Sequence, residues 1–168
     1  MRTCRRSFNS LKDKVKPLSQ LVKIIPRLKK EGKKIVFTNG CFDLLHYGHA
    51  KYLEAAKSKG DILVVGVNSD ASIRRIKGKD RPIVGENNRL HLIAALESVD
   101  FAVLFQEDTP LGLIKKIQPD ILIKGADWKN KGIVGADFIK SYGGRVSTVE
   151  LVKGLSTTNL IKIIAKTN

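Results

Sequence analysis

The amino-acid sequence predicts an α/β fold: a doubly wound, Rossmann-like domain with a five-stranded parallel sheet and helices on both faces. Short apolar runs alternate with amphipathic stretches from Lys34 to the end of the chain. The runs are apolar at almost every position, as expected of strands that are covered on both faces. Such strand–helix alternation is typical of βα units with right-handed crossovers, which place ligands at the carboxyl ends of the strands.

The elements are expected in this order. Residues 1–16 form a basic, frayed N-terminal extension, and residues 17–168 form a single domain that opens with a helix from about Ser19 to Lys30. Strands are expected at 35–38, 62–68, 101–104, 121–124 and 146–149. Helices are expected at 49–59, 70–76, 86–97, 110–117, 136–142 and 157–166. The polar, glycine-bearing loop 77–85 is predicted to be a mobile flap over a ligand site.

Composition describes a globular protein of the soluble class: 168 residues, 42% hydrophobic and 28% charged. All apolar runs are far shorter than a bilayer requires, so no membrane partner is expected. The two cysteines, Cys4 and Cys41, belong to no cluster with zinc-ligand spacing. A reduced, cytoplasmic protein with free thiols is therefore predicted.

The formal net charge of +15 raises the question of a nucleic-acid partner. Residues 1–34 hold twelve Lys and Arg against two acids, Asp13 and Glu31, so +10 of this charge belongs to the N-terminal segment. That segment has no recognised DNA- or RNA-binding motif, so no specific nucleic acid is expected. A basic nucleic-acid-binding module remains a distant alternative because a basic segment binds polyanions through counterion release.

The first predicted strand leads directly into a motif with a glycine and two histidines, TNGCFDLLHYGH at residues 38–49. Gly40 allows a sharp turn and a close approach of a ligand to the backbone. His46 and His49 are three residues apart at the start of a helix, so both imidazoles can lie on one side. The free N–H groups of the helix start favour an anion at the same place. The pattern predicts a phosphate site; no metal site is assigned because no third ligand is near.

The segment Gly40–His49 resembles the GxFDxxHxGH signature of the cytidylyltransferase-like superfamily of nucleotidyltransferases. A second block, KGLSTTN at residues 153–159, is similar to the Ser-Thr-Thr element that meets the triphosphate at the start of the last helix in this superfamily. Related cytidylyltransferases carry an arginine at about Leu151. Lys153 can only partly replace it, because an ammonium group is a point charge and not a fork.

Between these two motifs lie the blocks VNSD (67–70), IKG (76–78), RP (81–82), EDTP (107–110), PD (119–120) and KGADW (124–128). This series resembles the blocks of the heptose 1-phosphate adenylyltransferase family, and the resemblance covers residues 18–166. The resemblance implies transfer of AMP from ATP to D-glycero-β-D-manno-heptose 1-phosphate, which gives ADP-heptose for lipopolysaccharide core synthesis and pyrophosphate. It also implies Mg²⁺ held mainly by the triphosphate, and a homodimer is common in the superfamily. The alternative is a cytidylyltransferase acting on glycerol 3-phosphate or another small phosphorylated alcohol, because the segment Gly40–His49 fits both.

The resemblance and the charges assign roles to individual residues. His46 and His49 are expected to donate to phosphate oxygens, and Lys77 to neutralise the α-phosphate or the sugar phosphate. The residues expected to contact the nucleotide are Asn39, Gly40, Cys41, Phe42, Gly48, Lys124, Gly125, Asp127, Trp128, Ser156, Thr157 and Thr158. Acceptor contacts are assigned to Asp43, Arg81 and Arg89.

Four of these residues have a structural alternative. Lys77 could be a solvated surface lysine, and Arg89 could pair with Glu86. Trp128 could stack on a ring or close the core. Asp43 could orient His46 or the loop backbone, or satisfy local N–H groups. Because positioning and charge stabilisation can account for phosphoryl-type transfer, no covalent enzyme intermediate is expected.

Overall fold

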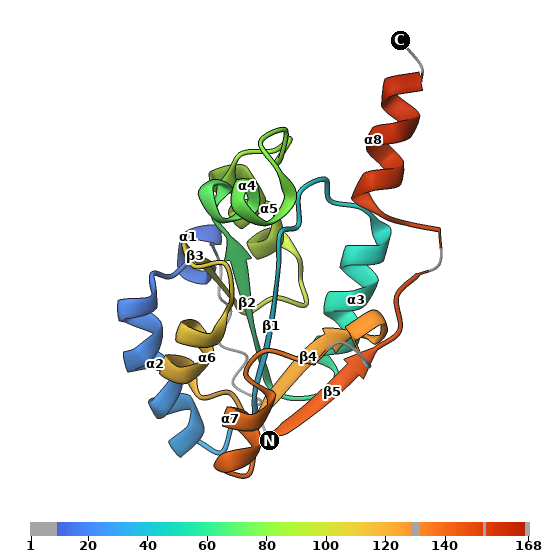
Figure 1. The fold of residues 1–168 in the computed structure, drawn as a ribbon. Helices are drawn as coiled ribbons and strands as arrows, with labels where there is room; N and C mark the ends of the chain where they lie inside the picture. The colour runs from blue at the N-terminus through green and yellow to red at the C-terminus, as the bar shows by residue number, and fades with distance from the viewer. Residues whose placement is uncertain (1–9, 129–131, 153, 167–168) are drawn as a thin grey trace.

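The computed structural model describes residues 10–128, 132–152 and 154–166. Its centre is one five-stranded, all-parallel sheet in the order β3-β2-β1-β4-β5, which confirms the predicted doubly wound architecture (Figure 1). The strands are β1 (Ile35–Gly40), β2 (Ile62–Asn68), β3 (Phe101–Phe105), β4 (Ile121–Gly125) and β5 (Arg145–Val149). The strand order reverses between β1 and β4, so the switch point of the sheet lies at the end of β1.

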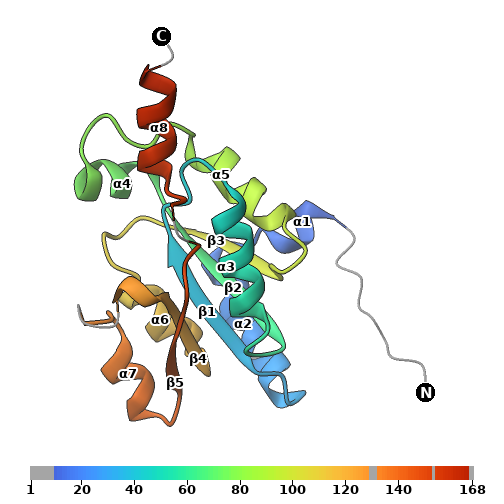
Figure 2. The same ribbon diagram turned by 90° about the vertical axis from the view of Figure 1, so that its right-hand side faces the viewer.

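Helices cover both faces of the sheet (Figure 2). The helices are α1 (Leu11–Lys14), α2 (Leu18–Lys30), α3 (Tyr47–Lys57), α4 (Asp70–Lys77), α5 (Glu86–Ala95), α6 (Leu111–Ile117), α7 (Ala136–Ser141) and α8 (Thr157–Lys166), with a 3-10 turn η1 (Ala126–Trp128). One apolar core joins α3 and α5 to the sheet, and a second joins α2, α6 and α7 to its other face. The strand side chains alternate between these two cores, which is why the runs are apolar at nearly every position.

Helix α2 shows how local pattern and packing agree. Leu21, Ile25 and Leu28 recur at helical spacing and are all buried in the second core. The helix begins after Pro17 instead of at Ser19, and Gly32 follows its end with φ of 78°. A positive φ is readily adopted by glycine, so the position of Gly32 as the stop is explained by its missing Cβ.

The N-terminal extension differs from its prediction in the part that the structure describes. Residues 1–9 lie outside the described residues. From Ser10 onward the chain forms α1, and Val15 makes a parallel bridge to Ala102 in β3. The Lys16 N–H donates to the Ala102 carbonyl at 3.1 Å. Residues 10–16 therefore add to the edge of the sheet and are not a frayed segment.

Helix α8 contrasts with the rest of the molecule. It extends away from the body in both views (Figures 1 and 2), and none of its described side chains is buried. Its first residue, however, contacts the loop between β1 and α3, because Thr157 Oγ1 donates to the Leu44 carbonyl at 3.4 Å. The base of α8 thereby becomes part of the wall of the cavity described below. Within the described ranges, no helix combines the length and the apolar character needed to cross a membrane.

Candidate active site

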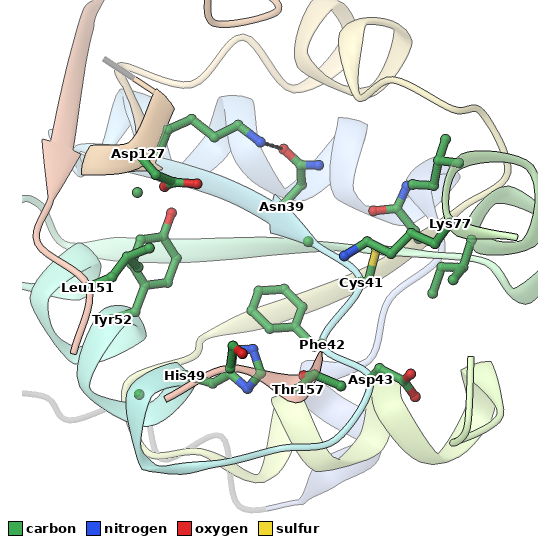
Figure 3. Close-up of a pocket in the computed structure, with 18 of the residues that line it drawn as sticks. Asn39, Cys41, Phe42, Asp43, His49, Tyr52, Lys77, Asp127, Leu151 and Thr157 are labelled. Carbon is green, nitrogen blue, oxygen red and sulfur yellow. Dashed lines mark hydrogen bonds between the residues drawn. The ribbon is translucent and has the colours of Figure 1, made fainter. Parts of the chain in front are cut away.

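A cavity of about 510 Å³ opens at the carboxyl ends of β1, β2 and β4, at the switch point of the sheet (Figure 3). All but one of the residues assigned from the sequence line it. Those that do are Asn39, Gly40, Cys41, Phe42, Asp43, His46, Gly48, His49, Lys77, Arg81, Lys124, Gly125, Asp127, Trp128, Ser156, Thr157 and Thr158. The exception is Arg89. These residues come from four parts of the sequence, 39–49, 77–81, 124–128 and 156–158, which meet in one place as expected of a parallel sheet with a switch point.

The two histidines lie together at the start of α3. Their rings stack with centroids 3.8 Å apart, and the His46 N–H donates to His49 Nδ1 at 3.4 Å. Because Nδ1 of His49 accepts this bond, the proton of the neutral ring is on Nε2. Burial lowers the pKa of His49 to about 4, with smaller contributions from the charges of His46 and Lys77, and burial also lowers the pKa of His46. Both rings are therefore neutral hydrogen-bond donors near pH 7.

Two glycines and a phenylalanine hold these rings in place. Phe42 adopts a φ of 46°, which turns its ring toward His49, edge to face with centroids 5.4 Å apart. A Cβ on Gly40 would lie 3.1 Å from the Phe42 ring, and a Cβ on Gly48 would lie 3.0 Å from the His46 ring. A side chain at either position would therefore push the neighbouring ring aside by a few tenths of an ångström. Among the described residues, His46 Nδ1 is a buried atom without a hydrogen-bond partner, so packing against His49 and Gly48 holds this ring.

Asp43 connects the turn after β1 to the flap. Its Oδ1 accepts hydrogen bonds from the N–H groups of Ile83 and Val84 at 2.8 and 2.9 Å, and its Oδ2 accepts one from Arg81 Nη1 at 3.0 Å. Burial by itself raises the pKa of Asp43, but the bonds from Val84, Ile83 and Arg81 outweigh it and keep the pKa below its usual value. Among the alternatives for Asp43, these bonds favour the one in which its carboxylate orients the loop backbone, here that of the flap. Asp43 also holds the Arg81 guanidinium at the cavity.

Arg89 does not reach the cavity, and its assignment as an acceptor contact needs correction. Its side chain is fully buried, and its guanidinium donates to the carbonyls of Val84, Cys41 and Asn68 and to the Asp70 carboxylate. Every branch of the fork is occupied, so the guanidinium ties together the ends of β1 and β2, α4 and the flap. The expected alternative, a pair with Glu86, is also absent: Glu86 accepts from the Asp70 N–H. A single sequence gives no indication that an arginine on an amphipathic helix is completely buried.

The wall formed by β4 carries a buried ammonium group. Lys124 Nζ donates to Asn39 Oδ1 at 2.5 Å, a bond drawn in Figure 3, and lies 5.5 Å from the centroid of the Trp128 ring. Burial lowers the pKa of Lys124 to about 8, although the nearby Cys41 and Asp127 act in the opposite direction. Trp128 is 40% exposed at the mouth of the cavity, so it does not close the core. The geometry leaves its ring free to stack on a planar ligand.

The base of α8 supplies hydroxyl groups to the same cavity. Ser156 Oγ accepts from the Asn159 N–H at 3.1 Å, so it caps the start of the helix. Leu151, which stands where related cytidylyltransferases carry an arginine, lines the cavity next to Gly125. This wall therefore lacks a guanidinium at Leu151. Lys153, the suggested partial replacement, lies outside the described residues.

Several cavity residues were not assigned from the sequence. They are Tyr52, Asn68, Ile73, Ile76, Asp108, Thr109, Pro110, Val134, Val152 and Leu155. Asn68 and the segment 108–110 follow the carboxyl ends of β2 and β3, and this position in a parallel sheet was a usable signal. Tyr52 gave no such signal, because it lies inside α3 and its hydroxyl is bonded to Thr38. In the described part of the chain, no group of three or more His, Cys, Asp or Glu could hold a metal ion.

A cradle of neutral imidazoles, helix-start N–H groups and flap cations at the switch point of a parallel sheet defines the chain as a nucleotidyltransferase. The family model described as cytidylyltransferase-like matches residues 37–163, and the chain belongs to this family. The match spans the sheet and every cavity wall, from β1 to α8.

Two curated relatives are proteins named bifunctional protein HldE. The one from Geobacter metallireducens is 56% identical over 153 residues, which is 91% of this chain and 31% of the relative. The one from Nitratiruptor is 52% identical over 148 residues, 88% of this chain and 31% of the relative. The chain therefore spans about a third of the length of these relatives.

Two solved structures resemble the fold. A lipopolysaccharide core biosynthesis protein from Thermoplasma volcanium is 38% identical, with a TM-score of 0.59 over 73% of this chain and 98% of that protein. A pantoate-beta-alanine ligase from Francisella tularensis is 17% identical, with a TM-score of 0.63 over 91% of this chain and 77% of that protein. The second likeness concerns the fold alone.

Proposed function

We propose that the protein transfers AMP from ATP to D-glycero-β-D-manno-heptose 1-phosphate and releases pyrophosphate. The observation that carries the proposal is the neutral His46–His49 pair at the start of α3, in the same cavity as the flap cations Lys77 and Arg81. Support for the heptose acceptor comes from the sequence blocks outside Gly40–His49 and from the relatives named HldE and lipopolysaccharide core biosynthesis protein.

In the proposed reaction, an oxygen of the sugar phosphate attacks the α-phosphorus of ATP. A new P–O bond forms, the bond between the α-phosphorus and the bridging oxygen breaks, and the electron pair leaves with pyrophosphate. Negative charge builds on that bridging oxygen, where His46 and His49 Nε2 donate hydrogen bonds. Lys77 and Arg81 reduce the repulsion between the two anions as they approach in line.

The proposal includes Mg²⁺ as a companion of the triphosphate. The cavity offers hydroxyl, amide and imidazole groups, which suit a metal held by phosphate oxygens and water. Bound there, Mg²⁺ would neutralise charge on the leaving pyrophosphate. We further propose that the reaction takes place in the cytoplasm. We also propose that the protein is a homodimer, and light scattering at micromolar concentration would test this oligomeric state.

A grid of substrates tests the proposed function. Pyrophosphate release is measured with ATP, CTP, UTP and GTP against heptose 1-phosphate, glycerol 3-phosphate and other phosphorylated alcohols. We expect turnover with ATP and heptose 1-phosphate, reduced at least a hundredfold by His49→Ala, because one donor to the leaving oxygen is lost. CTP preference with glycerol 3-phosphate would replace the proposal by the cytidylyltransferase alternative.

The same grid addresses the nucleic-acid alternative. A basic binding module would be indicated by two results together: no pyrophosphate release with any pair of substrates, and a steeply salt-dependent affinity for DNA that His46→Ala leaves unchanged. If the proposed function is correct, any DNA binding is weak. His46→Ala then abolishes turnover and leaves the affinity for DNA unchanged.

A further inference from the structure

Asn68, the last residue of β2, points to a second recognition element in the cavity. It lines the cavity, although the residue is only 3% exposed. Its Nδ2 lies 3.0 Å from Ser72 Oγ, and Ser72 Oγ donates to the Glu107 carbonyl at 2.9 Å. A serine hydroxyl has one proton, and here Glu107 receives it, so Ser72 Oγ can only accept from Asn68.

This chain of hydrogen bonds determines which way the amide faces. With Nδ2 held by a fully buried serine, Oδ1 is the atom of Asn68 that is left to face the cavity. Within the described residues, Oδ1 has no hydrogen-bond partner. The main chain of Asn68 is also held, because its carbonyl accepts from Arg89 and its strand pairs with Phe105 of β3. The result is a preorganised acceptor on a rigid support.

The position of Asn68 separates it from the opposite wall of the cavity. Gly40 of β1 pairs with Val67, so Asn68 lies just beyond it on the β2 side, whereas Lys124 reaches Asn39 from the β4 side. In Figure 3, Asp127, Tyr52 and Leu151 lie at one end of the cavity and Lys77 at the other. Trp128 follows Asp127 directly in η1, so the end with Asp127 suits a flat, apolar ring such as a purine. Asn68 ends β2 and is connected through Ser72 to the Glu107 carbonyl, next to the cavity residues Asp108 and Thr109. The helix that follows Asn68, α4, ends at Lys77.

The chemistry of an amide oxygen restricts its ligand. A phosphate near neutral pH offers acceptors almost exclusively, so it would repel Oδ1, and Lys77 and Arg81 are the groups at this end that suit it. A sugar hydroxyl offers a donor. We infer that Asn68 is a specificity-determining residue whose Oδ1 accepts a hydrogen bond from a hydroxyl of the sugar-phosphate acceptor. This inference rests on the proposed function and adds the part of the site that reads the acceptor.

The test is a thermodynamic cycle that combines a substitution of Asn68 with removal of single hydroxyl groups from the sugar. Wild type and Asn68→Ala are assayed by pyrophosphate release with the intact sugar 1-phosphate and with a series of mono-deoxy analogues. We expect Asn68→Ala to lower kcat/KM for the intact acceptor about tenfold, with KM for ATP within about twofold of wild type. One deoxy analogue should penalise the wild type by a similar factor and the variant hardly at all. Asn88→Ala, an exposed asparagine on α5, is the matched control and should leave both constants unchanged.

Ser72→Ala provides a second variant that keeps Asn68 itself. Without Ser72 Oγ the amide is free to rotate, so kcat/KM for the acceptor should fall about threefold while KM for ATP again stays constant. Thermal melting of each variant shows whether a loss of kcat/KM comes from misfolding. If one of the two variants misfolds, the kinetics of the other variant test the inference.

Three outcomes would overturn the inference. They are a rise in KM for ATP in place of the acceptor effect, equal penalties for all deoxy analogues in wild type and Asn68→Ala, and unchanged acceptor kinetics in the variants. If the wild type uses a different sugar 1-phosphate, the proposed function fails, yet the same cycle on that sugar still tests Asn68. Absence of turnover with any sugar phosphate overturns both.

Discussion

At the scale of single residues, protonation determines how the cavity can hold a triphosphate. His46 and His49 are neutral donors near pH 7, so the positive charge must come from the lysines and from Arg81. Burial brings the pKa of Lys124 to about 8. Its charge is therefore present at neutral pH and disappears in mildly alkaline solution.

The affinity for ATP should reflect this ionisation. Only the protonated form of Lys124 attracts phosphate, and this form dominates below pH 8 in the free protein. As the pH rises above this value, the Kd for ATP should increase by up to about tenfold per pH unit, until the pKa of the complex is reached. Titration calorimetry between pH 7 and 9.5 measures this dependence of the Kd on pH.

Lys124→Arg is the control for the alkaline loss of affinity, because a guanidinium stays charged over this whole range. Its Kd for ATP should not change with pH. A wild-type Kd that is equally flat would show that Lys124 does not contact the nucleotide.

At the scale of elements, the start of α3 combines a helix with a crowded imidazole. In Gly48→Ala, alanine favours the helix by up to about 1 kcal/mol, but the new Cβ lies 3.0 Å from His46 Cε1 and Nδ1. We expect the melting temperature to stay constant or rise while turnover falls at least about tenfold, because the His46 ring must move from its position. Thermal melting and steady-state kinetics on one preparation measure both.

Gly112→Ala near the start of α6 is the matched control for Gly48→Ala. A Cβ there would meet only Glu107 Oε1, at an ordinary 3.6 Å. It should gain stability without any loss of turnover. If Gly48→Ala kept full turnover as well, the placement of His46 would not matter for the reaction.

Arg89 connects several elements, and its removal should destabilise the fold. Arg89→Met would leave the carbonyls of Cys41, Asn68 and Val84 and the Asp70 carboxylate without their donor. We expect the free energy of unfolding in urea to drop by about 3–5 kcal/mol, as for a broken buried ion pair.

Arg75→Met serves as the comparison for Arg89→Met, because the Arg75 side chain is 50% exposed where it pairs with Asp108. Its effect should be at most about 1 kcal/mol. Similar values for both variants would contradict the buried network.

At the scale of the whole molecule, the edge strand β3 is completed by the N-terminal extension. A chain that begins at Leu18 loses the Val15–Ala102 bridge and the hydrogen bond from the Lys16 N–H. Val15 is only partly buried, so we expect a loss of about 1–2 kcal/mol. This corresponds to a melting temperature lower by about 4 °C. Turnover at 25 °C should remain unchanged, because residues 10–17 do not line the cavity.

A chain that begins at Ser10 is the reference for this truncation, since it keeps both contacts to Ala102. Differential scanning calorimetry and turnover on the two chains give the comparison. Loss of turnover in the chain from Leu18 would show that the edge of β3 influences the cavity.

Much of the architecture was predictable because burial requires apolar residues within each strand and helix, and this pattern can be read from short stretches of the sequence. The runs at 35–38, 62–68, 101–104 and 121–124 became β1–β4 with small shifts at their ends, since strands covered on both faces must be apolar throughout. Residues 10–16 are different: apart from the partly buried Val15 side chain, their contact with β3 uses backbone groups, which every sequence possesses. A bridge of this kind depends on where an edge strand lies in space.

The site divides in the same way between short-range and long-range information. The turn at Gly40, the paired imidazoles and the hydroxyls before α8 are each contained in a few consecutive residues, so their chemistry could be inferred from the sequence alone. The hydrogen bonds that orient Asn68, those that Arg89 donates and those from the Ile83 and Val84 N–H groups to Asp43 join separate segments of the chain. Local spacing records which groups are present, whereas their partners depend on distances that exist only once the sheet has brought the ends of β1, β2 and β4 together.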